Sequence, residues 1–418
     1  MNMNKLILEG IKVADFCWVA AGPQLGRELA HHGATVIRVE GHKRPDVLRV
    51  GSSHKDGIPG LNRSGTFAGL NTGKLGVSID LNNPKGAELA RRLALSSDVV
   101  TEGMVPGTLK RWGLDYESLS KEKPELIYVS TSQQGQFGPY AQFGGYGSLG
   151  AALGGFSNML GTPDRDPQVL TNNYTDMTAP WSLVMAVTGA LRYRNKTGRG
   201  INIDQAQIEA GLTFLGTDLL DYQVNGHVAT RKGNRDPQMA PHGVFSCAGK
   251  DRWVAIAVET DEQWRALAGV MGFPDWSRDE RYATLAGRQA NEDELERRIS
   301  DWTTQLAAEE VMVKLQAAGV PAGVVVTGED LFKDPQLAYR EHFQWLEHRS
   351  IGKHAAHMPA YRMSVTEAKP KFTAPCMGQH NEQVFRGMLG LTEKEYADCI
   401  AVGAITTDAM WPKGMRID

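Results

Sequence analysis

The chain has 418 residues, and its 45 Lys and Arg residues against 48 Asp and Glu residues give a formal net charge of −3. This balance lacks the basic excess of nucleic-acid-binding proteins, so we expect no nucleic-acid partner. No segment reaches the ~20 apolar residues of a membrane-spanning helix, and we expect no membrane partner. The four cysteines are scattered without CxxC spacing, which favours a cytoplasmic location.

Strands and helices alternate through residue 130. Short β-rich segments lie at 11–16, 36–40, 77–81, 98–100 and 125–130. Pro23 and Pro84 each stand in the first turn of a predicted helix, where the missing amide hydrogen of proline costs nothing. This alternation predicts an α/β fold with a parallel, Rossmann-like sheet.

A glycine-rich stretch, residues 133–156, interrupts this pattern. Within it, Gly144-Gly145-Tyr146-Gly147 is too flexible for the interior of an ordinary helix or strand. It is either a loop beside a ligand or a glycine-mediated packing contact. The elements predicted beyond it are a helix at 176–193, a strand at 201–204 and a helix at 206–224.

Two segments have the composition of linkers. Residues 225–242 are rich in Gly, Arg, Asn and Pro, and residues 342–371 also read as irregular. The unit between them is predicted to contain a strand at 253–258 and helices at 291–305 and 309–318. The last predicted element is a helical tail around 381–389.

Few residues in the chain match a known catalytic or cofactor motif. The turn after the first strand reads Gly22-Pro23-Gln24-Leu25-Gly26, a G-x-x-x-G spacing rather than the G-x-G-x-x-G of dinucleotide-binding folds. The turn is weak evidence for NAD binding, although Glu40 stands near where a ribose-binding acid would be. The turn also suits a helix N-terminus that accepts another phosphate or carbonyl group. Histidine and cysteine spacings suggest no metal site.

Asp176 stands where a polar segment enters the apolar helix at 176–193. An acid in the first turn of a helix is explained by capping and by the helix dipole. The spacing alone therefore favours a helix cap over a catalytic carboxylate.

Several motifs, in their order along almost the whole chain, resemble those of the class III CoA-transferase family, which also contains the α-methylacyl-CoA racemases. These motifs are Ala21–Pro23, Gly33–Glu40, Asn71–Lys74, Pro106–Tyr116, Gly135–Tyr140, Lys196–Gly200 and Gly378–Asn381. The chain resembles formyl-CoA, carnitine and benzylsuccinate CoA-transferases. The resemblance implies an enzyme that acts on an acyl-CoA and a small carboxylic acid, with coenzyme A as part of its substrate and no metal.

The resemblance also implies site residues. Asp176 falls where the family has its catalytic aspartate, before the Lys196–Gly200 turn. The residues expected to contact CoA are Val19, Ala20, Ala21, His42, Ile79, Met104, Arg111 and Tyr146. Two positions, Gly41 and Gly103, depart from the family pattern. At the first of these, His42, Lys43 or Arg44 would have to meet a phosphate in place of the usual basic residue.

The mechanism that the resemblance implies is covalent. Asp176 would attack the donor thioester and become an aspartyl-CoA thioester, from which an acceptor carboxylate takes the CoA. We expect the backbone amides of Gly144 and Gly145 to stabilise the oxyanion, because no side chain blocks their approach; the other interpretation is a hinge. A dicarboxylate donor such as succinyl-CoA and a bulkier, even aromatic, acceptor are expected.

By the same resemblance, residues 1–225 and 327–418 form a large CoA-binding domain, residues 226–326 form a small α+β domain, and two chains interlock as a dimer. The partner is a second copy or a homologous subunit. One alternative is a non-catalytic subunit, which the departures at Gly41 and Gly103 suggest. A racemase is less favoured, because Gly145-Tyr146-Gly147 stands where that branch has Gly-His-Asp, so the second base is missing.

Overall fold

The computed structural model describes residues 6–51, 53–169 and 173–411. The chain divides into two compact units. The first comprises Met1–Phe156, Val169–His227 and Gln336–Asp418, and the second comprises Ser157–Gln168 and Val228–Pro335. The second unit thus includes a short segment, 157–168, that lies within the predicted large domain 1–225.

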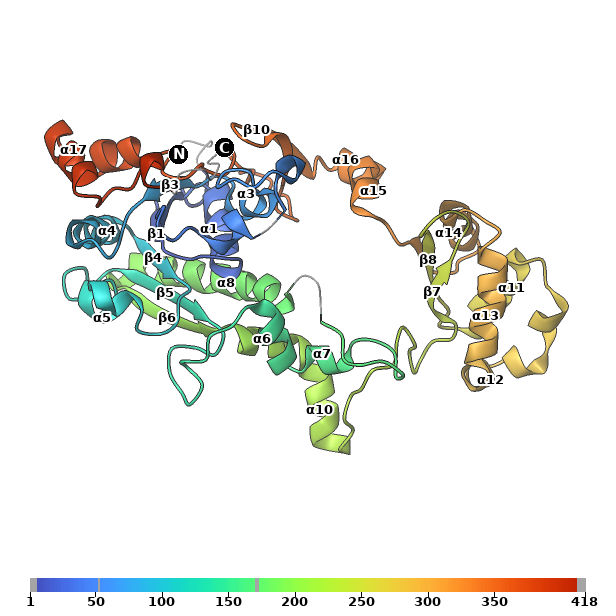
Figure 1. Cartoon of the computed structure of the whole chain (residues 1–418). Coiled ribbons are helices and arrows are strands. Elements are labelled where there is room, and N and C mark those ends of the chain that lie inside the picture. The colour runs from blue at the N-terminus through green and yellow to red at the C-terminus, as the bar shows by residue number, and fades with distance from the viewer. Residues whose placement is uncertain (1–5, 52, 170–172, 412–418) are drawn as a thin grey trace. The chain divides into compact units, whose positions relative to one another are not determined.

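The first unit is built on a six-stranded parallel sheet, which confirms the predicted α/β fold (Figure 1). Its strands are β1 (Lys12–Asp15), β2 (Thr35–Glu40), β3 (Leu75–Ser78), β4 (Val99–Glu102), β5 (Ile127–Ser132) and β6 (Ile201–Ala206). Their order in the sheet is β3-β2-β1-β4-β5-β6. The order reverses between β1 and β4, and doubly wound sheets bind ligands outside the carboxyl ends of the strands at such a point.

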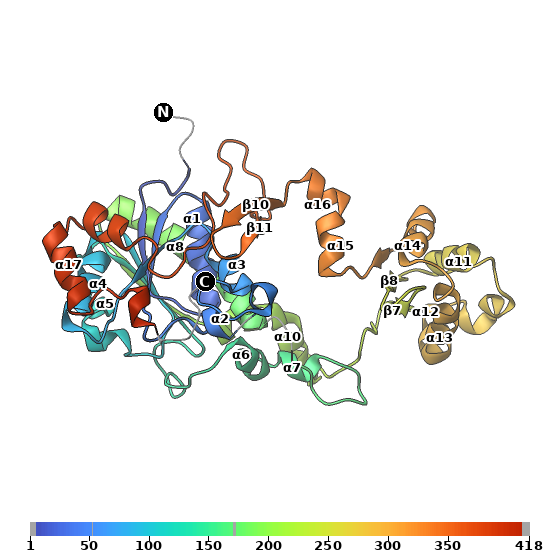
Figure 2. The ribbon, with the colours of Figure 1, turned by 45° about the horizontal axis from the view of Figure 1, so that its top comes forward.

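Helices cover both faces of this sheet, and alternate residues of each strand feed two separate cores. Val13 of β1 packs with α1 (Ala21–His31) and α8 (Tyr174–Thr197), whereas Ala14 packs with α4 (Pro84–Ser96) and α17 (Glu393–Ala401). Figure 2 shows α4 and α17 on one side of the sheet and α1 and α8 on the other. The sheet therefore lies between two well-packed helix layers, which hold the strands that carry the loops at their carboxyl ends.

The sequence patterns placed most of these elements correctly. Pro84 is the first residue of α4, as predicted, and the helix predicted at 176–193 is α8. The helix predicted at 206–224 is interrupted: α9 (Gln207–Leu212) and α10 (Gly216–Asn225) are separated by a 3-10 turn, Thr213–Leu215. The remaining helices of the first unit are α2 (Val47–Val50), α3 (Gly65–Asn71), α5 (Tyr116–Leu119), α6 (Gly147–Leu153) and the π-helical turn Gln383–Met388, with α7 (Phe156–Met159) and α16 (Pro335–Tyr339) at its boundaries.

The interpretation of 342–371 as irregular is wrong for residues 343–357. They form an antiparallel hairpin of β10 (Phe343–His348) and β11 (Gly352–His357). Nδ1 of His348 accepts the backbone amides of Ser350 and Ile351, at 3.1 and 3.2 Å, and so holds the turn. The hairpin depends on cross-strand pairing and on a side-chain bond to its turn, and neither of these requires alternating apolar residues. The search for apolar alternation therefore did not predict the hairpin.

The second unit combines a small antiparallel sheet with helices. The sheet has the order β7-β8-β9, with β7 (His242–Ser246), β8 (Trp253–Ala257) and β9 (Ala322–Val324). The helices are α11 (Asp261–Val270), α12 (Leu285–Ala290), α13 (Glu292–Thr303), α14 (Ala308–Ala317) and α15 (Gly328–Lys333). Its core joins Phe245 and Ile256 of the sheet to Trp264, Leu295 and Leu315 of the helices. No helix in the described ranges is both long and apolar enough to cross a membrane.

Candidate active site

Asp176 lies in the first turn of α8 and is only 4% exposed. Its backbone amide donates to the carbonyl oxygen of Asn173 at 2.8 Å, but its side chain does not cap the helix. Oδ2 of Asp176 is buried and has no hydrogen-bond partner among the residues that the structure describes. A carboxylate that capped α8 would accept an amide of that helix's own first turn, so capping of α8 does not account for this side chain.

Burial raises the pKa of Asp176 to about 6, and the backbone N–H of Gly147 opposes this shift. Burial removes the water that stabilises a carboxylate, which is the usual cause of a raised pKa in an acidic side chain. The group is nevertheless ionised at neutral pH. A poorly solvated carboxylate with an unoccupied acceptor oxygen is chemically suited to act as a nucleophile.

Gly147 is the residue of the glycine-rich segment that meets Asp176. It begins α6, and a Cβ atom added there would lie 2.3 Å from Oδ2 and 2.5 Å from Cγ of Asp176. The side chain of Thr175 donates to the carbonyl oxygen of Gly147 at 3.2 Å, which ties α6 to α8. A side chain at position 147 could not coexist with the present position of the carboxylate.

The two glycines predicted to stabilise an oxyanion lie nearby in sequence, but their neighbours differ. A Cβ atom at Gly144 would meet only Val105, at 3.6 Å, and one at Gly145 would meet Leu149, at 2.8 Å. Their role stays a prediction. Gly147 belongs to the same Gly-Gly-Tyr-Gly run, and the density of glycines there was the only sequence signal for it.

The N-terminus of α1 meets the start of α8. The side-chain amide of Gln24 in α1 donates to the carbonyl oxygen of Asp176 at 3.2 Å. Ala20 precedes α1 without a capping side chain, and the first turn holds no acidic residue. The first amides of such a helix remain available to an anion or a carbonyl group. The start of α1, with Val19, Ala20 and Ala21, therefore follows β1 at the reversal point of the sheet. The side chain of Gln24 connects this helix to Asp176.

The other residues expected to contact CoA are distributed differently. Arg111 and Tyr146 are exposed, and Met104 is partly buried. His42 is only 1% exposed, and its Nδ1 lies 2.9 Å from Oγ of Ser78. Ile79 is 3% exposed and belongs to the core between the sheet and α4.

Further charged residues near this edge are engaged by the protein itself. Glu40, which stands where a ribose-binding acid would be, accepts Nη2 of Arg49 at 2.6 Å and is 3% exposed. Lys43 donates to Oδ2 of Asp80 at 2.6 Å. These bonds give Glu40 a structural partner, and the NAD interpretation gains no support.

Sequence analysis did not identify Glu102, at the carboxyl end of β4. Burial raises the pKa of Glu102 to about 7, and the negative charge of Asp204 adds to the shift. Oε2 of Glu102 accepts the amide of Met104 at 2.9 Å, and Oε1 accepts the side-chain amide of Gln136 at 3.3 Å. Shifted carboxyl groups cluster at functional sites, and this one lies beside a residue expected to contact CoA.

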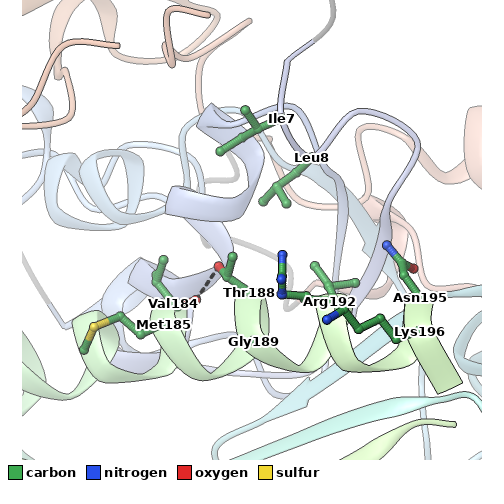
Figure 3. Close-up of a pocket in the computed structure, with 10 residues that line it drawn as sticks. Ile7, Leu8, Val184, Met185, Thr188, Gly189, Arg192, Asn195 and Lys196 are labelled. Carbon is green, nitrogen blue, oxygen red and sulfur yellow. Dashed lines mark hydrogen bonds between the residues drawn. The ribbon is translucent and has the colours of Figure 1, made fainter.

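A groove of about 810 Å³ lies along the outer face of α8, between that helix and Ile7 and Leu8 (Figure 3). Figure 3 shows Val184, Met185 and Thr188 along it, with Oγ1 of Thr188 donating to the carbonyl oxygen of Val184 at 2.7 Å. Asp176 precedes Val184 by two turns of helix, roughly 12 Å. The groove is therefore separate from the carboxylate. In the part of the chain that the structure describes, no group of three His, Cys, Asp or Glu residues could hold a metal ion.

The six-stranded parallel sheet places this chain among the doubly wound α/β proteins, whose ligand sites lie at the carboxyl ends of the strands. The family model described as CoA-transferase family III matches residues 8–381. The chain belongs to this family and is a class III CoA-transferase.

Curated relatives match the sequence of this chain along nearly its full length. The chain is 33% identical over 390 residues to a succinyl-CoA–D-citramalate CoA-transferase of Chloroflexus aurantiacus, covering 93% of this chain and 96% of that protein. It is also 33% identical to a succinate–glutarate CoA-transferase of Agrobacterium fabrum, covering 92% and 96%. The β subunit of a succinyl-CoA–L-malate CoA-transferase of C. aurantiacus is 31% identical, and the match covers 94% of this chain and 96% of that subunit. The α subunit is 30% identical, and the match covers 94% of this chain and 91% of that subunit.

A solved structure supports the fold. The crystal structure of a CaiB/BaiF family protein from Brucella suis matches with a TM-score of 0.84 and 31% identity, covering 92% of this chain and 100% of that one. The large parallel sheet and the smaller antiparallel sheets of this chain are therefore those of the CaiB/BaiF fold.

Proposed function

We propose that this chain transfers CoA from an acyl-CoA donor such as succinyl-CoA to a free carboxylic acid through an aspartyl-CoA thioester on Asp176. The observation that carries the proposal is the side chain of Asp176, which is 4% exposed with a buried oxygen that lacks a partner among the described residues. Relatives whose names specify succinyl-CoA or succinate support the choice of donor.

Four displacements complete the reaction. The Asp176 carboxylate attacks the donor thioester carbon, the C–S bond breaks, and a mixed anhydride and CoA thiolate form. The thiolate attacks the aspartyl carbonyl carbon of the anhydride, releases the donor acid as a carboxylate and leaves the aspartyl-CoA thioester. The acceptor carboxylate then displaces the thiolate, and the thiolate attacks the acceptor acyl carbon and regenerates Asp176. No net proton is consumed, and the thioester energy is kept only if water stays out, which the burial of Asp176 favours.

The start of α1 is the proposed contact for CoA. Its uncapped amides beside Val19, Ala20 and Ala21 suit a polar group of the pantetheine or a phosphate. The guanidinium of exposed Arg111 can meet the phosphates, since arginine binds phosphate oxygens in pairs. Exposed Tyr146 precedes Gly147 and can face the acyl chain.

The active protein is proposed to be an interlocked dimer of this chain or a heteromer with a homologous subunit. Apolar side chains that a lone chain exposes support a subunit contact: Met185 on α8 is 70% exposed, and Leu220 and Val224 on α10 are 58% and 70% exposed. The pair of relatives named as α and β subunits makes a non-catalytic subunit the second candidate function.

The test is mass spectrometry of CoA products after incubation of the purified chain with acyl-CoA donors and a panel of dicarboxylic and aromatic acids. A new acyl-CoA, together with hydroxamate formation at Asp176 when hydroxylamine is added to the donor complex, supports the proposal. Absence of products from this chain alone, with activity restored by a copurifying homologue, supports the second candidate. Deuterium exchange at the α-carbon of a 2-methylacyl-CoA without CoA transfer would establish a racemase instead.

Turnover is expected to depend on pH through Asp176. The nucleophile must be ionised, and burial raises its pKa to about 6, so the protonated and inactive form accumulates as the pH falls through that value. The value of kcat/KM should be level above this pKa and fall about tenfold per pH unit below it. A stopped assay with succinyl-CoA from about pH 5 to 8 measures the profile. Unchanged kcat/KM at the acid end would contradict the assignment.

A further inference from the structure

Val19, between β1 and α1, has a backbone conformation that its side chain disfavours. Its φ is 67°, in the left-handed region, where a β-branched residue is an outlier. Such conformations persist only where the surrounding structure holds them, and they concentrate at ligand sites. The bonds that hold this turn therefore bear on what the turn does.

Asp46 bonds directly to the strained residue. Oδ2 of Asp46 accepts the backbone amide of Val19 at 3.0 Å and also accepts Nη2 of Arg38. Oδ1 of Asp46 accepts the amide of Leu48 at 2.9 Å and caps α2. The side chains of Asp46 and Arg38 are both 0% exposed. One buried carboxylate thus connects the Val19 turn to a guanidinium and to a helix start.

Cys17, two residues earlier, is held in the same way at both of its backbone groups. Nη1 of Arg38 donates to the carbonyl oxygen of Cys17 at 2.8 Å. The amide of Cys17 donates to Oδ1 of Asp15 at 3.0 Å, and Oδ2 of Asp15 accepts Nζ of Lys74 at 2.8 Å. Fully buried charged side chains therefore bond the backbone on both sides of the turn.

Folding alone does not explain this arrangement. Removing two charges from water is costly, and buried ion pairs can often be replaced by apolar residues with no loss of stability. Here the charged groups converge on the backbone of Cys17 and Val19, immediately before the uncapped start of α1. Small displacements of such a turn would move the first amides of the helix.

We propose that Asp46, together with Arg38, is a positioning residue that holds Val19 in its left-handed conformation and so presents the start of α1 to CoA. This inference rests on the proposed function, because it takes the Val19 turn as the CoA contact. Asp46 itself does not touch the bound CoA. Its effect passes through the backbone amide of Val19.

A double-mutant cycle tests the coupling between the two residues. Asp46→Ser can still cap α2, since serine is a good N-cap residue, but its shorter side chain cannot also reach the amide of Val19. Val19→Gly makes the left-handed conformation easily accessible. The dissociation constant for CoA is measured by calorimetry, and the thermal midpoint is recorded for each variant. Asp46→Asn, which keeps the volume and one acceptor oxygen, carries the same cycle if Asp46→Ser does not fold.

We expect Asp46→Ser to weaken CoA binding about tenfold when Val19 is present and less than threefold in the Val19→Gly background, because glycine no longer needs to be held. The KM for acyl-CoA should rise with kcat little changed. Asp98→Ser is the matched control: Asp98 also accepts both a backbone amide, that of Lys12 at 2.8 Å, and a guanidinium, that of Arg194 at 2.8 Å, but it bonds the start of β1 and not the turn, so it should lower the thermal midpoint and leave CoA affinity unchanged.

The outcomes separate the inference from the proposed function. Equal losses of CoA affinity in both backgrounds, or no loss from Asp46→Ser, overturn the positioning role while CoA binding by the wild type stands. A wild-type protein that does not bind CoA overturns both. A loss of affinity from Asp98→Ser as large as that from Asp46→Ser would also overturn the inference, because it would attribute the effect to a general loss of stability.

Discussion

Asp176→Asn should lower turnover by several orders of magnitude while the protein stays folded. A neutral amide cannot attack a thioester carbonyl, whereas asparagine is as good as aspartate at a helix start. The assay is CoA transfer from succinyl-CoA, with the circular dichroism spectrum as a check on folding. Asp218→Asn is the matched control, because Asp218 also lies in the first turn of a helix but is exposed, and its turnover should match the wild type.

The same substitution should stabilise the protein at alkaline pH. The pKa of Asp176 is raised from 3.8 to about 6, so the folded state loses stability as the pH rises between these two values, and the loss is complete above about pH 6. Asparagine removes that cost, which is at most about 3 kcal/mol for a shift of about two pH units. The gain should be present at pH 8 and vanish below about pH 4, where the aspartate is protonated in both the folded and unfolded states. Urea denaturation at both pH values measures it.

Two results would contradict this assignment of Asp176. One is a variant that turns over at the wild-type rate, with mass spectrometry excluding deamidation back to aspartate. The other is a loss of stability at pH 8, which would indicate that the carboxylate makes a bond that the fold needs. Either result would return Asp176 to the role of a helix residue.

Gly147→Ala is expected to lower kcat about 100-fold or more, since misplacement of a reacting group by about 1 Å can cost that much. The added Cβ atom would lie 2.3 Å from Oδ2 of Asp176, so the carboxylate or the start of α6 has to move. The backbone at Gly147 is not left-handed, so the effect is purely steric. Single-turnover transfer from succinyl-CoA measures the loss.

Gly69→Ala serves as the control for this substitution. Gly69 lies in the short helix α3, and nothing lies within 4 Å of the position its Cβ would take. Alanine there should leave turnover unchanged. If Gly147→Ala kept wild-type turnover, the close approach of α6 to the carboxylate would have no catalytic role.

Much of the fold could be predicted because its helices and strands depend on local sequence patterns. Runs of apolar residues, proline at the start of α4 and the alternation of strands and helices are properties of neighbouring residues, and they were sufficient for the parallel α/β sheet. The hairpin at 343–357 was missed because its stability comes from cross-strand pairing and from the side chain of His348 at the turn.

For the site, the sequence by itself determined the residue types, the family and the placement of Asp176 at the start of a helix. Only the tertiary structure decided that Gly147 meets its carboxylate, that burial raises its pKa, and that Asp46 accepts the amide of Val19. The physical reason is the separation along the sequence over which each kind of interaction acts. Helix and strand preferences act over a few residues, whereas solvation of a carboxyl group and contacts between residues 19 and 46 or 147 and 176 depend on how distant segments pack.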